Sequence, residues 1–215
     1  MPADFLTEVQ EQRYGRYAGD PTTAQLARFF YLDDADRTLI LQRRHAHTRL
    51  GFALQLCAVR FLGTFLSDPT DVPPSLASYL AGQLHIDDPA CLVRYRDSST
   101  QWAHASEIRQ HYGYHDFAEQ PAHFRFVRWL YTRAWLSAER PSVLFDHATA
   151  YLVERKTLLP GVTTLVRLVG QARDRAAERL WQRLAQQPTP AQRAKLETLL
   201  VLGEGKRTTQ LDQLC

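Results

Sequence analysis

The sequence of 215 residues is long enough for one large domain or two smaller ones that share a helical framework. Apolar residues make up 45% of it and charged residues 23%, so the chain can bury a core and is neither a low-complexity nor a disordered sequence. The formal net charge of +3 is too small to indicate a polyanionic partner by itself.

The sequence also restricts where the protein is expected to work. Its first residues lack the basic segment and the long apolar segment of a signal peptide. The most apolar stretch, residues 50–66, contains Gln55 and Arg60 and is too short to span a bilayer. Three cysteines without Cys-x-x-Cys spacing argue against a disulfide framework or a cysteine zinc site. We therefore expect a cytoplasmic protein without a membrane segment.

Helical periodicity dominates the first half of the chain. Asp33 suits the N-cap of a helix that reaches Arg44, and a break at residues 45–47 follows. The next helix is apolar nearly all round from Leu50 to Leu66, which is typical of the centre of a bundle, and Asp68-Pro69 is expected to end it.

The pattern continues with short helices and clear stops. Pro73-Pro74 predicts a helix start, and the Asp87-Asp88-Pro89 sequence marks a boundary. A short helix is expected over residues 90–96. A longer helix should run from Thr100 to Tyr112, with Ser99 as its N-cap and Gly113 as its stop.

Helices also fill the second half. One carries an apolar stripe of Phe124, Val127, Tyr131, Ala134 and Trp135, and another the stripe Leu144, Ala148, Tyr151 and Leu152. After Pro160-Gly161, a long amphipathic helix has a seam of Leu165, Val169, Ala172, Ala176, Leu180 and Leu184. A linker at residues 187–190 precedes a last short helix, which carries Leu196, Leu199 and Leu200.

The strand signal is weak, since alternation is not sustained and hairpin dipeptides are missing. The sequence therefore predicts an all-α fold, a multi-helix bundle with two helix-turn-helix-like modules followed by a long amphipathic helix. We expect a first DNA-binding module over residues 1–86 and a second over residues 87–159. The long and short helices should occupy residues 160–215.

Basic residues cluster in two windows that contain no acid. Residues 37–67 hold five arginines between groups of aspartates, and residues 120–138 hold three more. Local positive fields of this kind attract polyanions even when the net charge is small. A solvated helix face remains the alternative explanation.

The first candidate DNA-binding segment covers residues 33–63, where two helices flank a break. In a helix-turn-helix, residues at the start of the second helix enter the major groove. The side chains that could contact guanine or phosphate there are Arg37, Arg43, Arg44, His47, Thr48 and Arg49. Alternatively, these arginines cap the C-terminus of the preceding helix.

The second candidate segment covers residues 90–114. Polar side chains at a helix start, with basic and aromatic neighbours, suit contacts to base edges and phosphates. We expect these contacts from Arg94, Arg96, Thr100, Gln101, His104, Arg109 and Tyr114. Trp102, Ile108 and Tyr112 are expected in the core instead.

The residues of an enzyme's site are not recognisable in the sequence. The eight histidines show no metal-ligand spacing, and neither a nucleophile elbow nor a phosphate-binding glycine loop occurs. The acids are scattered or lie at expected helix starts, which gives no support to a two-metal nuclease. We expect no catalytic residue, metal, cofactor or small-molecule substrate.

Several short strings occur in an order that indicates a known family. They are Phe5–Thr7 (FLT), Arg49–Cys57 (RLGFALQLC), Arg60–Gly63 (RFLG), Asp71–Pro74 (DVPP), Glu107–Ile108 (EI), Tyr112–Tyr114 (YGY) and Leu158–Leu165 (LLPGVTTL). Together they resemble the N-terminal region of transposases of the Tn-three family of bacterial replicative transposons. The resemblance runs from about residue 5 to the end of the chain.

The resemblance implies a function as well as a fold. In that family this region is helical and contains helix-turn-helix-like modules. It recognises the terminal inverted repeats of the transposon, and the acidic catalytic triad lies several hundred residues further on. The resemblance carries over to Arg43, Arg44 and Arg49 in the first module and to His104, Glu107 and Tyr114 in the second. We therefore expect a bacterial protein that binds double-stranded DNA and lacks the catalytic part.

Two other functions remain open. The chain could be a free-standing regulator that occupies transposon ends. It could instead be a helical interaction module that self-associates, or whose arginine seam at residues 167–183 binds another protein. The apolar stripe at residues 165–180 could pair with a partner helix, although burial of this stripe within the bundle also explains it.

Overall fold

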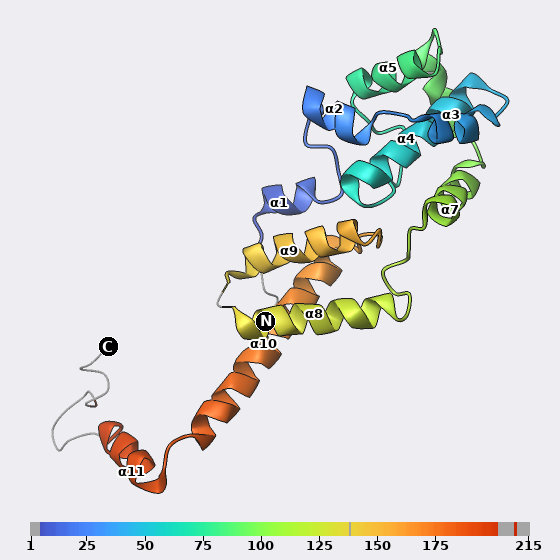
Figure 1. Ribbon diagram of the computed structural model, residues 1–215. Helices are drawn as coiled ribbons and strands as arrows, with labels where there is room; N and C mark the ends of the chain where they lie inside the picture. The colour runs from blue at the N-terminus through green and yellow to red at the C-terminus, as the bar shows by residue number, and fades with distance from the viewer. Residues whose placement is uncertain (1–4, 138, 202–208, 210–215) are drawn as a thin grey trace.

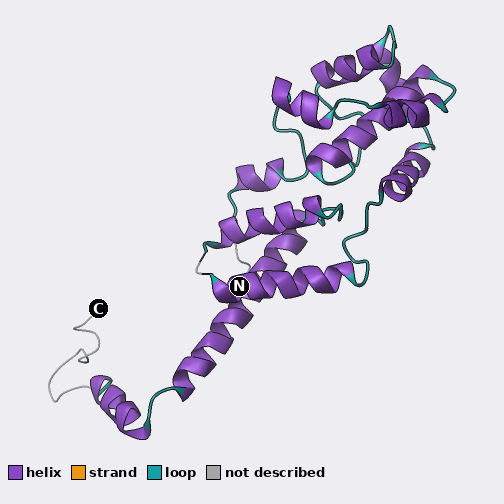
Figure 2. Ribbon diagram, in the orientation of Figure 1, coloured by secondary structure: helices purple, strands orange, loops and turns teal. Residues whose placement is uncertain are grey.

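The computed structural model describes residues 5–137, 139–201 and 209 of the chain. Within that part it contains eleven α-helices, one 3-10 helix and no β-strand, which confirms the predicted all-α fold (Figures 1 and 2). The rest of the expected third segment, residues 202–208 and 210–215, lies outside the described residues. None of the described helices is long and apolar enough to cross a membrane.

Most of the first half of the chain packs around one central helix. This first core contains α2 (Thr23–Phe29), α3 (Asp34–Leu41), α4 (Ala46–Leu62), α5 (Pro74–Gln83), η1 (Pro89–Leu92), α6 (Val93–Arg96) and α7 (Gln101–Tyr112). Eleven of the 17 residues of α4 are buried, and α3, α5, η1, α6 and α7 all pack against it. The prediction of a central apolar helix is confirmed.

Two helix ends follow the predictions, because local hydrogen bonds fix them. Asp33 is the N-cap of α3, and its carboxylate accepts a hydrogen bond from the backbone N–H of Asp36 at 2.8 Å. Gly113 ends α7 with a φ of +69°, a left-handed conformation that glycine adopts without strain.

Other boundaries differ from the predictions. The break between α3 and α4 lies at residues 42–45 rather than 45–47. α4 ends at Gly63, whose φ is +74°, and does not continue to Asp68. The N-cap of α7 is Thr100 rather than Ser99, and the hydroxyl of Ser98 accepts a hydrogen bond from the N–H of Thr100.

The boundary expected at residue 86 does not divide the hydrophobic core. Leu92, Tyr95 and Ile108 are buried in the same cluster as the apolar side chains of α4. Gly51 allows this packing, because a Cβ at its position would lie only 2.3 Å from a ring carbon of Tyr95. Residues 87–112 therefore belong to the first core.

A second core forms from α8 (Ala122–Leu136), α9 (Pro141–Glu154) and α10 (Val162–Gln186), which all pack against one another. α8 contributes Phe126 and Leu130, whereas Phe124, predicted to be part of the apolar stripe, is 63% exposed. The stripe prediction for α8 is wrong in phase, because α9 and α10 cover a face rotated from the expected one.

The seam of α10 is buried only along its first part. Leu165, Val169, Ala172 and Ala176 are buried, whereas Leu180 and Leu184 are each 47% exposed. Figure 1 shows the reason, since α10 continues past α8 and projects from the second core toward α11 (Pro190–Leu199). The last short helix was predicted, and it contains no buried residue.

Backbone contacts join the two cores. The N–H of Leu159 donates to the carbonyl of Gly63 at 2.9 Å, and the N–H of His115 donates to the carbonyl of Lys156 at the same distance. The segment after α1 (Glu8–Arg13) also spans both cores, because Tyr14 packs against Phe145 of α9 and Tyr17 stacks on Phe61 of α4.

A buried carboxylate ties three helices of the first core together. The side chain of Asp36 on α3 is 1% exposed and accepts two hydrogen bonds from the Arg60 guanidinium of α4, at 2.7 and 2.6 Å. The hydroxyl of Tyr112, at the end of α7, donates a third at 2.6 Å. Burial opposes ionisation of Asp36, but Arg60 and Tyr112 outweigh it and hold the pKa of the carboxyl below its usual value.

We predict that Asp36→Asn lowers the free energy of unfolding at pH 7 by about 3 kcal/mol, because Arg60 loses a buried partner. The wild-type contribution should be complete above the unfolded pKa of about 4 and disappear as the pH falls through the lower folded value. Urea unfolding at pH 7 and pH 3 measures both effects. Asp34→Asn, an exposed change in the same helix, is the control, and equal stability of the two variants would contradict the prediction.

We also predict that Gly51→Ala destabilises the protein by about 2 kcal/mol, because the added methyl group must displace the Tyr95 ring within a packed core. Gly82→Ala, in α5, is the matched control. No atom lies within 4 Å of a Cβ built there, so the change should be neutral or stabilise by up to about 1 kcal/mol. Thermal unfolding followed by circular dichroism compares the two. A Gly51→Ala midpoint at or above that of Gly82→Ala would refute the packing argument.

Candidate nucleic-acid interface

Basic side chains from both predicted segments gather around the start of α4. Arg44 and His45 are exposed in the α3–α4 turn, and the rings of His45 and His47 stack with their centres 5.4 Å apart. Desolvation, followed by the charges of His45 and Arg94, lowers the pKa of His47, so Arg94 of α6 lies within electrostatic range of this turn. Together with Thr48, we call these residues the basic edge: Arg44, His45, His47, Thr48 and Arg94.

Two arginines of the basic edge have no partner in the protein. Arg44 and Arg94 are exposed, and neither forms a hydrogen bond or ion pair with a side chain or backbone group of the described residues. Such guanidiniums remain fully available to an external anion.

The other arginines of the first segment have structural partners. Arg43 lies over the Phe52 ring at 3.9 Å, donates to the carbonyl of Leu39 and pairs with Glu107. The Nε of Arg49 donates to the carbonyl of Arg43 at 2.7 Å, and the Nε of Arg37 donates to the carbonyl of Leu32 at 3.0 Å. Arg43 therefore has the alternative role, in which an arginine side chain caps the C-terminus of the preceding helix, α3.

Several predicted residues of the second segment also bond within the protein. Gln101 donates to the carbonyls of Tyr95 and Arg96 and so fixes the turn between α6 and α7. The ion-paired arginines are Arg96, with Asp68, and Arg109, with Asp116. Thr100 bonds to the hydroxyl of Ser98, and Tyr114 is partly buried against the first core.

His104 faces the core rather than the solvent. It is 7% exposed, its Nδ1 lies 2.8 Å from the hydroxyl of Tyr95, and its ring contacts the edge of Phe52. Desolvation, reinforced by the Arg43 charge, lowers the pKa of His104 to about 4. The imidazole is therefore neutral at pH 7 and accepts or donates one buried hydrogen bond.

The sequence analysis missed the outer face of α7. Trp102, expected in the core, is 85% exposed, whereas Ile108 is fully buried as predicted. The two residues are six positions apart and therefore lie about 120° apart around the helix. They cannot both belong to one narrow buried face. Only His104 and Ile108 of α7 are buried. The α7 outer face consists of Trp102, Ala103, Ser106 and Gln110.

The α7 outer face and the basic edge belong to one side of the first core. The ion pair of Arg43 and Glu107 places the α3–α4 turn beside α7, and Figure 1 shows both along the same margin of the core. Ala103 and Ser106 have small side chains, so the middle of α7 is narrow. This helix can therefore enter a major groove, which is wide enough for an α-helix. α4 can present only its first turn, since the rest of that helix is buried.

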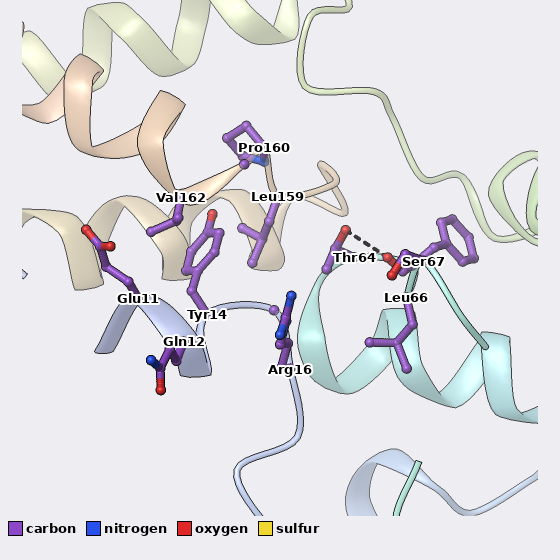
Figure 3. Close-up of a pocket in the computed structure, with 13 residues that line it drawn as sticks. Glu11, Gln12, Tyr14, Arg16, Thr64, Leu66, Ser67, Leu159, Pro160 and Val162 are labelled. Carbon is purple, nitrogen blue, oxygen red and sulfur yellow. Dashed lines mark hydrogen bonds between the residues drawn. The ribbon is translucent and has the colours of Figure 1, made fainter. Parts of the chain in front are cut away.

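A separate open pocket of about 490 Å³ lies at the joint between the two cores (Figure 3). Its lining comes from the segment around Tyr14, from residues 64–67 after α4 and from residues 159–162 before α10. The hydroxyl of Tyr14 is buried and has no hydrogen-bond partner in the described structure. This pocket belongs to the joint and not to the basic edge.

Groups of three or more histidine, cysteine, aspartate or glutamate side chains that could hold a metal ion do not occur among the described residues. The side chains that the basic edge and the α7 outer face bring together are mainly cationic, aromatic or polar, which suits the binding of an anion.

Comparison with known proteins identifies the family. A family model described as a domain of unknown function (DUF4158) matches residues 5–172. The chain belongs to this DUF4158 family.

Relatives of the DUF4158 domain are transposases. The chain is 52% identical over 215 residues to the transposase for transposon gamma-delta of Escherichia coli K12, a match that covers all of this chain and 22% of the relative. It is 32% identical over 195 residues to the transposase for transposon Tn501 of Pseudomonas aeruginosa, covering 88% of this chain and 19% of the relative.

The transposase for transposon Tn1546 of Enterococcus faecium is 28% identical over 198 residues, which cover 92% of this chain and 20% of the relative. The chain thus spans about a fifth of the length of these relatives. The predicted resemblance to the N-terminal region of Tn-three-family transposases is confirmed.

We predict that His104 makes the stability of this DUF4158 domain depend on pH. Unfolding raises its pKa from about 4 to its ordinary value, so the folded state should lose stability as the pH falls from about 6.5 to about 4. The glutamine of His104→Gln is polar but does not titrate. Between pH 7 and 4.5, the free energy of unfolding of this variant should therefore fall by about 2 kcal/mol less than that of the wild type. Urea unfolding across this range, with His111→Gln as the exposed control, measures the difference. Parallel curves for all three proteins would refute the assignment.

Proposed function

We propose that this domain binds double-stranded DNA at the terminal inverted repeats of a transposon, as part of a transposase. The α7 outer face enters the major groove, and the basic edge contacts the phosphates beside it. One observation carries the proposal, which is that Arg44 and Arg94 have no partner among the described residues and lie beside a helix with an exposed face. The similarity to transposases supports the choice of DNA as the anion.

The exposure of Trp102 favours a partner at the α7 outer face. A tryptophan that is 85% exposed leaves a large apolar surface in water, and such side chains are common where a second molecule covers them. Gln110, two turns further along α7, offers an amide that can bond an adenine edge. Ala103 and Ser106 lie between them and permit close approach.

The predicted contact residues fall into two groups under this proposal. Arg44, His47 and Arg94 contact the DNA, together with Trp102 and Gln110, whereas the hydroxyl of Thr48 donates to the carbonyl of His45 and holds the first turn of α4. Hydrogen bonds or ion pairs within the protein instead occupy the side chains of Arg37, Arg43, Arg49, Arg96, Thr100, Gln101, His104 and Arg109. Tyr114 packs against the first core. These residues brace the turn and helices that carry the contacts.

We predict that two pairs of substitutions separate phosphate contacts from base contacts. Arg44→Ala/Arg94→Ala should reduce the slope of log affinity against log salt by about 2 and weaken binding to every sequence alike, because each phosphate contact contributes about 0.9 to the slope. Trp102→Ala/Gln110→Ala should keep the slope and reduce the preference for a transposon-end duplex over a shuffled one by about tenfold or more.

Fluorescence anisotropy with both duplexes across a salt series measures these effects. Arg28→Ala/Arg167→Ala removes the same charge from exposed positions on α2 and α10 and should leave the preference unchanged. If neither duplex binds at low salt, or if Arg44→Ala/Arg94→Ala binds like the wild type, the proposed interface is wrong.

A further inference from the structure

The crossing of α8 and α10 forms a second basic and aromatic surface, far along the chain from the basic edge. A hollow of about 180 Å³ opens there, lined by Tyr131, Thr132, Trp135, Leu136, Arg179 and Arg183. The guanidinium carbons of Arg179 and Arg183 lie 5.9 and 5.4 Å from the centre of the Trp135 ring. Arg179 also donates to the hydroxyl of Tyr131, at 3.5 Å. We call these six residues the α8–α10 surface.

The arginines of the α8–α10 surface are not neutralised. Arg179 and Arg183 are exposed, and neither forms an ion pair within the described part of the chain. The nearest acids in sequence, Asp174 and Glu178, lie about 100–180° from these arginines around the helix, so they point away from the hollow. α8 itself has no acidic residue.

The positive charge continues beyond the hollow along both helices. Arg175 precedes Arg179 by about one turn of α10, and Arg128 precedes Thr132 by about one turn of α8. Both are exposed and have no ion-pair partner in the described structure. From Arg175 to Arg183, the row on α10 extends about 12 Å, a length over which a DNA strand presents several phosphates.

We infer that the α8–α10 surface binds the phosphate backbone of duplex DNA, in a segment beyond the one that α7 contacts. This inference rests on the proposed function, because it extends the same duplex to a second surface. Guanidiniums pair with phosphate oxygens through two parallel hydrogen bonds, and the Tyr131 hydroxyl can donate a further one. Trp135 holds both guanidiniums in place, which reduces the side-chain entropy lost on binding.

The geometry favours DNA over an acidic protein as the occupant. A protein interface of useful affinity has an apolar centre. At this hollow four of the six lining side chains are cationic or carry a hydroxyl group, Trp135 lies against the two guanidiniums, and Leu136 is the one exposed aliphatic side chain. The α8–α10 surface also lies at the C-terminal end of α8, a helix of 15 residues and about 22 Å. Because the contacts of one helix in the major groove already occupy about one turn of duplex, a surface at the far end of α8 requires a further segment of DNA.

Duplexes of different length test the inference. The probes are random-sequence duplexes of about 10 and about 32 base pairs, close to one and three helical turns. On the longer duplex, Arg179→Ala/Arg183→Ala should reduce the slope of log affinity against log salt by about 2. On the shorter duplex, which cannot contact both surfaces at once, the slope should equal that of the wild type.

Three further proteins make the outcome decisive. Arg179→Lys/Arg183→Lys retains the charge and should retain most of the slope on the longer duplex, which excludes misfolding as the cause of the alanine effect. The control Arg28→Ala/Arg167→Ala removes two charges elsewhere and should change the slope by less than about half as much. Arg44→Ala/Arg94→Ala tests the proposed function independently of the α8–α10 surface.

Each negative result has a different meaning. If Arg179→Ala/Arg183→Ala keeps the wild-type slope on the longer duplex, or the control loses as much, the inference is overturned, while a lower slope for Arg44→Ala/Arg94→Ala leaves the proposed function intact. If only Arg44→Ala/Arg94→Ala leaves the slope of log affinity against log salt unchanged, the proposed interface is wrong, and the α8–α10 surface is retained as a DNA contact. A change in sedimentation without a change in DNA binding would assign the surface to self-association and overturn the inference.

Discussion

The arrangement of the first core depends on the buried carboxylate of Asp36. An ionised group that is 1% exposed is tolerated only when its hydrogen-bonding capacity is satisfied, and Arg60 and Tyr112 supply that requirement from two other helices. The same carboxylate also belongs to the capping box that begins α3. A single group thus fixes α3, the last turn of α4 and the end of α7 relative to one another. The basic edge and the α7 outer face lie on one side of the core as a consequence.

The five arginines of the first acid-free window differ in their roles although they look alike in the sequence. Arg60 pairs with Asp36, and Arg37, Arg43 and Arg49 donate to backbone carbonyls, which leaves only Arg44 without a partner in the described structure. The sequence could not separate them, because the deciding partners are remote. Glu107 is 64 residues from Arg43, and Arg94 reaches the turn from another helix. A window of charge therefore does not distinguish an arginine that is available to an outside partner from one that is paired within the protein.

The accuracy of the other predictions follows the range of the interactions behind them. Helix type, the Asp33 cap, the Gly113 stop and the burial of α4 depend on spacing within one helix, and all were predicted. The phase of the α8 stripe, the exposure of Trp102 and the packing of residues 87–112 depend on which helices cover which faces, and these predictions were wrong or incomplete. Trp102 is an example of this limit. Its apolar side chain alone predicts a place in the core, whereas its position around the helix axis relative to the buried Ile108 shows that it faces outward.

The joint between the two cores links the proposed DNA contacts to each other. Gly63 has a left-handed backbone, and a Cβ there would lie 2.8 Å from Val153 and 3.0 Å from Leu159, so a bulkier residue would separate the cores. The hydrogen bond from Leu159 to Gly63, the packing of Tyr14 against Phe145 and the stacking of Tyr17 on Phe61 add further constraints. A fixed joint lowers the entropy lost when a second surface engages a duplex that the first already holds. The two surfaces, each with few unpaired arginines, can in this way hold one DNA segment more tightly than either could alone.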